Sequence, residues 1–296
     1  MNTNLFRTGY IAIIGRPNVG KSTLMNRLIG QKISITSRKA QTTRHRIVGI
    51  YTDPQSQFIF VDTPGFQLKH KNLMNRHMNR GVTSVLNECD AVFFVVEALR
   101  FGNDDEKVIE LLPTKVPVIL VVNKIDKVKD KSALLPFLEK IAQVFKFQAI
   151  IPVSAQRATQ VKDLLDTSRP LLPIADAIFS EDDVTDRNMR FLAAEFIREK
   201  IFRLSGEELP YATSVIIEKY TEDNGTVRIN AAIIVDKDNH KAIIIGKGGE
   251  KLKQIGTEAR LDLEKLLGTK VFLELWVKVK SGWADDKAVL KELGFD

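Results

Sequence analysis

Length, charge and cysteine content narrow the classes of protein to which this chain can belong. The 296 residues predict two domains, and the hydrophobic fraction of 44% is enough for packed cores. The net charge of +7 is typical of a protein with an anionic partner, either nucleic acid or a membrane surface. The single cysteine, Cys89, excludes an internal disulfide. We expect a cytoplasmic protein with no signal peptide, no membrane span and no disulfide partner.

Residues 10 to about 172 alternate apolar, strand-like runs with helix-like runs. We expect strands over 10–14, 46–52, 57–62, 91–96, 117–122 and 149–153. We expect helices near 21–30, 74–87, 105–112, 132–144 and 158–170. This alternation predicts a doubly wound α/β domain with a mostly parallel sheet, whose ligand lies at the carboxyl ends of the strands.

The segment Gly15–Ser22 has the spacing G-x-x-x-x-G-K-S between a predicted strand and a predicted helix. This is the phosphate-binding P-loop, in which glycines let successive backbone N–H groups point at phosphate oxygens. Lys21 would reach the β- and γ-phosphates, and the Ser22 hydroxyl would hold Mg²⁺. The alternative is an ordinary glycine turn, which the strand–loop–helix context disfavours.

A basic, polar loop over 31–49 follows the P-loop helix and contains no acidic residue. A threonine in a mobile loop at this position can complete a Mg²⁺ shell when a γ-phosphate is present. We favour Thr43 over Thr42 for this role. A second basic stretch, 67–80, is interpreted as a solvated helix face, with an RNA-facing or partner-facing role as the alternative.

The strand predicted over 57–62 ends in Asp62-Thr63-Pro64-Gly65. Asp62 can bind Mg²⁺ directly or through water, and the Gly65 N–H can sense the γ-phosphate. An acid that only caps a turn is the alternative, and the strand before it disfavours that reading. The next residue is Phe66, whose phenyl ring cannot orient an attacking water molecule by hydrogen bonding. We therefore expect slow intrinsic hydrolysis of a bound nucleoside triphosphate, and we propose no side chain as the general base.

Asn123-Lys124-Ile125-Asp126 follows another apolar strand. The Asp126 carboxylate can accept two hydrogen bonds from guanine, whereas adenine lacks that pair of donors. Asn123 can tie this loop to the P-loop, and the Lys124 stem can lie over the base. Ser154-Ala155, after the strand near 150–153, offers a backbone N–H for the guanine carbonyl.

A second domain is predicted after Pro170 and Pro173, and we set the domain boundaries at 1–175, a linker at 176–186, and 187–296. The linker is acidic and loop-like. We expect a helix over 190–204, strands over 212–220 and 226–235 joined by a hairpin, a helix over 250–267, a strand over 271–279 and a tail helix over 284–293. The apolar run 240–245 is of uncertain type.

Gly246-Lys247-Gly248-Gly249 follows that apolar run and precedes a helix with a basic start. This G-x-x-G pattern, in an α–β–β…α–β order, is typical of the loop of an RNA-binding KH domain, where glycines let backbone approach nucleotides. A plain helix-entry turn is the alternative. The candidate RNA-binding residues are Lys241, Ile245, Gly246, Lys247, Gly248, Gly249, Lys251 and Lys253.

Taken in order, G-R-P-N-V-G-K-S, D-T-P-G, N-K-I-D and S-A resemble the GTP-binding domain of translation-factor-class GTPases. The stretches 32–50, 208–211 and 273–283 resemble the Era family of bacterial GTPases, which has a P-loop GTPase domain followed by an α+β KH domain. The resemblance covers nearly the whole chain. It implies GTP or GDP with Mg²⁺ as ligands, and binding of small-subunit ribosomal RNA near its 3′ end during ribosome assembly. It also implies peripheral contact with the inner face of the cell membrane, and a K⁺ ion held by Asn18 beside the phosphates.

The expected roles follow from these motifs. We assign catalysis to Lys21, Thr43 and Gly65, and Mg²⁺ binding to Ser22, Thr43 and Asp62. The expected GTP-binding residues are Gly15, Arg16, Pro17, Asn18, Val19, Gly20, Lys21, Ser22, Thr23, Asp62, Thr63, Pro64, Gly65, Phe66, Asn123, Lys124, Ile125, Asp126, Ser154 and Ala155. One rival hypothesis is a GTPase whose C-terminal module binds protein or membrane. The other is an ATPase-type metabolic enzyme, which Asp126 disfavours.

Overall fold

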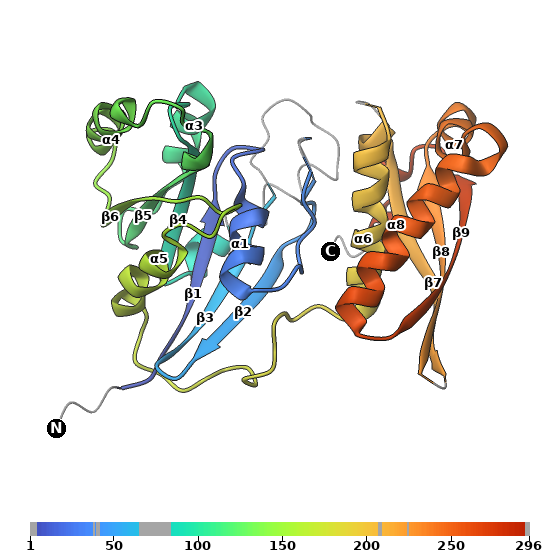
Figure 1. Ribbon diagram of the computed structural model, residues 1–296, viewed down its shortest axis with the longest axis horizontal. Helices are drawn as coiled ribbons and strands as arrows, with labels where there is room; N and C mark the ends of the chain where they lie inside the picture. The colour runs from blue at the N-terminus through green and yellow to red at the C-terminus, as the bar shows by residue number, and fades with distance from the viewer. Residues whose placement is uncertain are drawn as a thin grey trace. The chain divides into compact units, whose positions relative to one another are not determined.

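The computed structural model describes residues 5–37, 39, 42–64, 84–206, 209–223 and 225–293. By packing, these residues divide into two compact units, each shown as a ribbon in Figure 1. The first unit contains the described residues up to Ser34 and those from Thr43 to Asp186. The second contains the described part of Ile35–Thr42 and the residues from Arg187 onward.

The first unit is built on a six-stranded sheet with the order β2-β3-β1-β4-β5-β6. The strands are β1 (Arg7–Ile14), β2 (Ile47–Asp53), β3 (Ser56–Asp62), β4 (Ala91–Glu97), β5 (Val118–Asn123) and β6 (Ala149–Pro152). Only β2 is antiparallel to its neighbour, β3. The described helices are α1 (Lys21–Ile29), α3 (Asn103–Ile109), α4 (Leu134–Ala142) and α5 (Val161–Ser168). In Figure 1, α1 and α5 lie on one face of the sheet, and α3 and α4 pack against the other. The predicted doubly wound, mostly parallel sheet is confirmed.

The central strands β4 and β5 are apolar up to their last residue because helices cover both faces. All six residues of β5 are buried, and so are the first six of β4. Continuous burial is typical of parallel strands in such a fold. The parallel register aligns Ile13 with Asp62, and Glu97 with Asn123. The loops after β1, β3, β4 and β5 therefore begin at one edge of the sheet.

The second unit has a three-stranded sheet with the order β7-β8-β9, in which β7 and β8 are antiparallel and β8 and β9 parallel. Its strands are β7 (Thr213–Asp223), β8 (Thr226–Val235) and β9 (Lys270–Val279). Its helices are α6 (Met189–Leu204), α7 (Asp238–Ile245), α8 (Glu250–Leu267) and the terminal α9 (Lys287–Glu292). Phe196 of α6, Ile233 of β8 and Ile255 of α8 are fully buried in one apolar core.

Several expectations about single elements can now be decided. The run 240–245 is helical, as part of α7, so its uncertain type is resolved. Most of the helix expected over 74–87 lies outside the described residues. The linker 176–186 has no helix or strand, but it bonds to the backbone of β2: Ile50 N–H donates to Val184 O at 2.9 Å, and Thr185 Oγ1 donates to Val48 O at 2.6 Å. Among the described helices, none combines the length and apolar content that crossing a bilayer requires.

Candidate functional site

The loop between β1 and α1 has the backbone geometry that its glycines were expected to provide. Gly15 has φ +153° and Gly20 has φ +102°. A Cβ atom at Gly15 would lie 2.3 Å from Val95 O, and one at Gly20 would lie 2.4 Å from Asn123 Nδ2. Any larger residue at these two positions would therefore push the loop away from the sheet.

Lys21 begins α1 with its side chain turned back into this loop. Its ammonium group donates to Gly15 O at 2.9 Å and to Arg16 O at 3.1 Å, and the residue is 6% exposed. Burial lowers the pKa of Lys21 to about 8, although the nearby Asp62 charge opposes this shift. The negative charge of a bound phosphate would strongly stabilise the protonated form of this buried lysine.

Three oxygen ligands converge beside Lys21. Ser22 Oγ donates to Asp62 Oδ2 at 2.6 Å and lies 2.9 Å from Thr43 Oγ1. A fourth side chain, Ser34, donates to the same Asp62 oxygen at 3.0 Å. Asp62 is fully buried, and burial raises the pKa of its carboxyl group even though Lys21 opposes the change.

The other carboxylate oxygen of Asp62, Oδ1, is buried with no hydrogen-bond partner among the described residues. A buried acceptor without a partner is costly, and a cation would satisfy it. One carboxylate and two hydroxyls are hard oxygen ligands of the kind that Mg²⁺ takes together with water and phosphate. The predicted set of Ser22, Thr43 and Asp62 is therefore brought together, and it fits Mg²⁺.

The loop after β5 is tied to the P-loop by Asn123, as expected. Asn123 Nδ2 donates to Val19 O at 2.9 Å, and its Oδ1 accepts from the N–H groups of Lys124 at 2.8 Å and Ala155 at 3.0 Å. Asp126 accepts from Ser154 Oγ at 2.5 Å, which orients its carboxylate. The expected contact of the Ala155 N–H with the guanine carbonyl stays a prediction: because this N–H bonds to Asn123, the carbonyl would have to share or replace that bond.

The remaining predicted nucleotide residues fall into two groups. Arg16, Pro17, Thr23, Thr63, Pro64 and Ile125 lie in or beside the same loops, and Thr63 Oγ1 donates to Ile13 O at 3.1 Å. Gly65 and Phe66, together with the basic stretch 67–80, lie outside the described residues.

The G-x-x-G segment of the second unit forms the turn between α7 and α8. Gly246, Gly248 and Gly249 have φ of +74°, +59° and +81°. At Gly246 a Cβ atom would also lie 2.7 Å from the Cβ atom of Lys251. The predicted lysines 241, 247, 251 and 253 surround this turn, and none of them forms an ion pair with a described residue. Their charges are thus available to phosphate groups.

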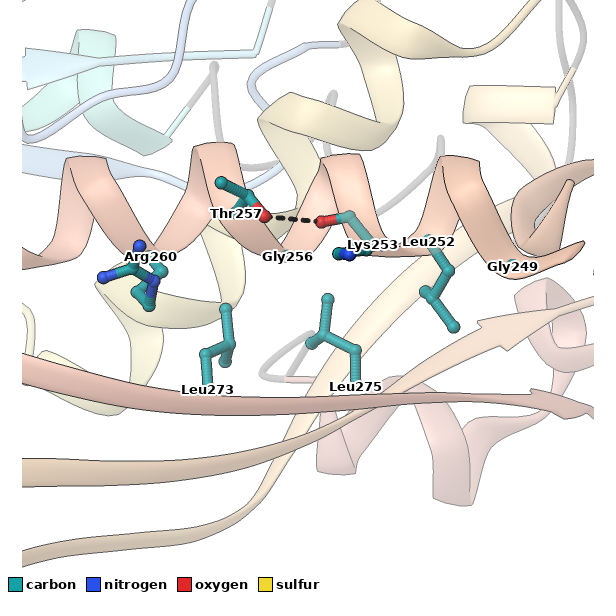
Figure 2. Close-up of a pocket in the computed structure, with 8 residues that line it drawn as sticks. All are labelled: Gly249, Leu252, Lys253, Gly256, Thr257, Arg260, Leu273 and Leu275. Atoms are coloured by element: carbon teal, nitrogen blue, oxygen red, sulfur yellow. Dashed lines mark hydrogen bonds between the residues drawn. The ribbon is translucent and has the colours of Figure 1, made fainter.

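A cavity of about 370 Å³ runs from this turn along α8. Figure 2 shows it between α8 on one side and the edge strand β9 on the other. We call it the α8–β9 groove, and its lining residues are Gly249, Leu252, Lys253, Gly256, Thr257, Arg260, Leu273 and Leu275. The leucines give it an apolar floor, while Lys253 and Arg260 place cations along one wall, and Arg260 is held by Glu264 at 2.7 Å. A strip of apolar surface with cations on one wall suits unpaired bases and their phosphates.

Sequence reasoning predicted only Gly249 and Lys253 among the groove residues. It also missed Glu97, whose carboxylate accepts from Lys124 Nζ at 2.6 Å, and Asp105, whose carboxylate pairs with Arg16 at 3.1 Å. The two leucines on either side of Glu274, Leu273 and Leu275, were the one available signal for the groove floor. The ion pairs gave no signal because their partners are 27 and 89 residues apart.

Comparisons with known proteins agree with this geometry. The family model described as "50S ribosome-binding GTPase" matches residues 10–124, and the model described as "KH domain" matches residues 208–284. The chain is therefore a P-loop GTPase that carries a C-terminal KH domain.

The relatives narrow this class further. The GTPase Era of Nitrosomonas eutropha is 57% identical over 296 residues, which is 100% of both chains. The GTPase Era of Neisseria meningitidis is 58% identical over 291 residues, 98% of this chain and 95% of the relative. A variant of the Aquifex aeolicus Era bound to GDP·AlF4⁻ matches with a TM-score of 0.94 at 39% identity, covering 98% of this chain and 99% of the other. The chain belongs to the Era family of bacterial GTPases. The predicted family, the GTPase class and the KH domain are thus confirmed.

Proposed function

We propose that this GTPase is a switch protein that binds single-stranded 16S ribosomal RNA near its 3′ end through its KH domain, in assembly of the small ribosomal subunit. The observation that carries the proposal is the α8–β9 groove, which opens beside the G-x-x-G turn. A solved Era structure in complex with MgGDPNP and nucleotides 1506–1542 of 16S ribosomal RNA supports it, with a TM-score of 0.94 and 39% identity.

In the nucleotide site, Lys21 and the backbone N–H groups of 15–22 bind the phosphates. Ser22, Thr43 and Asp62 would hold Mg²⁺, which when bound neutralises charge on the β- and γ-phosphates. Gly65 completes the proposed phosphate contacts. Asp126 accepts hydrogen bonds from the guanine edge, with Asn123 and Ser154 fixing the loops around it. Lys21 is the positioned cation, and its buried ammonium stabilises charge on the transferring phosphate.

Hydrolysis is proposed to be slow and to respond to K⁺. Phe66 replaces the amide that positions water in signalling GTPases, and a phenyl ring has no group that can orient water. Asn18 is an exposed residue at φ +67° in the P-loop, and its amide oxygen is the proposed ligand of K⁺. We expect faster GTP hydrolysis in KCl than in NaCl at equal ionic strength, with the difference lost in Asn18→Ala. Equal rates in both salts for the wild type would remove K⁺ from the proposal.

RNA binding is proposed to use both the turn and the groove. The lysines around Gly246–Gly249 meet phosphates, and the bases lie against Leu273 and Leu275. The basic stretch 31–49 is the rival surface. The groove favours the KH mode because it supplies apolar area for bases as well as charge.

We also propose the domain boundaries 1–175, 176–186 and 187–296, and a cytoplasmic location with peripheral contact with the membrane. The two sheets support the division, and the net charge of +7 supports contact with an anionic surface.

The test is a titration of fluorescein-labelled RNA with the sequence of the 3′ end of 16S RNA, followed by anisotropy. It is run with a non-hydrolysable GTP analogue and Mg²⁺, with GDP and Mg²⁺, and without nucleotide. Saturable binding that a scrambled RNA of equal length fails to compete supports the proposal. Binding that the scrambled RNA competes equally, with a steep salt dependence, would point to a diffuse basic surface instead.

A further inference from the structure

Glu97 is a carboxylate at the nucleotide site that belongs to none of the GTPase motifs. It ends β4, directly opposite Asn123 in the sheet register. Its side chain is 13% exposed, and one carboxylate oxygen accepts from Lys124 Nζ at 2.6 Å. Its other oxygen lies 3.4 Å from Arg100, whose side chain is 74% exposed and therefore contributes little.

The Lys124 ammonium that Glu97 holds has a second partner in the P-loop. Lys124 Nζ also donates to the backbone carbonyl of Asn18, at 2.5 Å. One charged group thus joins the end of strand β4, the N-K-I-D loop and the P-loop. Burial by itself raises the pKa of Glu97, but the hydrogen bond and charge of Lys124 outweigh it, so that the pKa is lowered overall. The Glu97 carboxylate is therefore ionised at neutral pH.

Both loops that meet at this ammonium hold a residue other than glycine in the left-handed region. Lys124 has φ +66° and Asn18 has φ +67°, and this conformation costs the lysine more than the asparagine. Such conformations persist only where surrounding contacts hold them. The contacts of Lys124 Nζ with Glu97 and with Asn18 O are contacts of that kind.

We propose that Glu97 is a positioning residue for guanine-nucleotide binding: it holds Lys124 against the P-loop and thereby slows release of the nucleotide. It acts through Lys124, whose stem the proposed guanine site places over the base, so the inference rests on that site. It assigns a determinant of the lifetime of bound nucleotide to the last residue of β4, which belongs to no recognised motif. The effect is expected on binding of both GDP and GTP, and not on the chemical step.

The experiment measures displacement of mant-GDP by excess GDP in a stopped-flow fluorimeter, with Mg²⁺ present. The variants are Glu97→Gln, which keeps the shape and an acceptor oxygen, and Glu97→Ala. The matched control is Glu110→Gln, which changes an exposed acidic residue of the same unit. We expect release to be at least threefold faster in Glu97→Gln and about tenfold faster in Glu97→Ala, since a hydrogen bond to a charged group is lost. kcat at saturating GTP should stay within twofold of wild type, so that the change appears in KM.

A second arm asks whether Glu97 acts through Lys124. In a Lys124→Met background, Glu97→Gln should accelerate release no further. The same acceleration in that background, or wild-type release rates in both Glu97 variants, would overturn the proposal. A lower melting temperature with unchanged release would show a purely structural role and would overturn it as well. Failure of the wild type to bind mant-GDP would instead contradict the guanine site itself, so the two failures are distinguishable.

Discussion

Gly256 allows a prediction in which stability and RNA binding change in opposite directions. It lies within α8 and lines the α8–β9 groove in Figure 2. A Cβ atom at this position would lie 3.4 Å from Leu275 Cδ1, which is ordinary contact, so Gly256→Ala fits without displacing the strand. Because alanine is favoured over glycine within a helix, this variant should be stabilised by roughly 0.5–1 kcal/mol.

A larger side chain at the same position occupies the space expected for RNA bases. A leucine extends beyond the Cβ atom into a groove of about 370 Å³ and covers its leucine floor. We expect Gly256→Leu to weaken RNA binding at least about tenfold, or 1.4 kcal/mol, with Gly256→Ala intermediate. The control Gln254→Leu places the same side chain on an exposed position of α8, and it should bind RNA as the wild type does.

The assay combines thermal unfolding by circular dichroism with RNA anisotropy and mant-GTP binding. The predicted pattern is a raised melting temperature and weakened RNA binding for Gly256→Ala, with nucleotide binding unchanged in all variants. A folded Gly256→Leu protein that binds RNA with wild-type affinity would refute the assignment of bases to this groove.

Three further predictions concern charge. Asp126→Asn should weaken GTP binding about tenfold or more and shift the preference toward xanthine nucleotides, because the new amide can donate to the 2-oxo group of xanthine. Titration with GTP and XTP measures both effects, and an unchanged affinity for GTP would remove Asp126 from the base site. Burial lowers the pKa of Lys21 from 10.5 to about 8, so the ammonium loses its proton as the pH rises above 8. The affinity for GDP, measured by calorimetric titration, should therefore be constant below pH 7 and decline above pH 8. A constant affinity up to pH 10 would contradict a contact of this ammonium with phosphate. Lys247→Asp should weaken RNA binding about tenfold and leave GTP binding unchanged. Adding Gly248→Asp should weaken RNA binding further and lower the stability, because Gly248 has φ +59°. Wild-type RNA affinity in the folded double variant would indicate that RNA binds the stretch 31–49 instead.

Much of the fold was predictable because its signals are local. The central strands β4 and β5 are apolar runs up to their last residue, and helices cover both faces of their sheet, so their positions followed from hydrophobicity alone. The run 240–245 was ambiguous because a short apolar stretch suits either a buried strand or a helix. Its helical state depends on packing: Ile244 is buried while Ile243 is 47% exposed, a pattern that alternation of a strand would also give.

The site was predictable where spacing along the chain fixes it and unpredictable where the fold fixes it. The P-loop and N-K-I-D motifs located Lys21 and Asp126, because their chemistry lies in short segments. Glu97 reaches the site only through the sheet register that aligns it with Asn123. Nothing in the sequence indicated that Gly256 lines the groove. A glycine within a helix indicates only a weak helix former, and its place in the groove depends on the packing of β9 beside α8.

The most direct test of the central claim is a crosslinking experiment on the full chain. RNA from the 3′ end of 16S RNA, carrying photoreactive thio-bases, is bound in the presence of a GTP analogue, irradiated, and the crosslinked peptides are identified by mass spectrometry. The account predicts crosslinks within residues 246–260 and 270–276, which contain the turn and both walls of the groove. Crosslinks confined to residues 31–49 or 67–80 would contradict it.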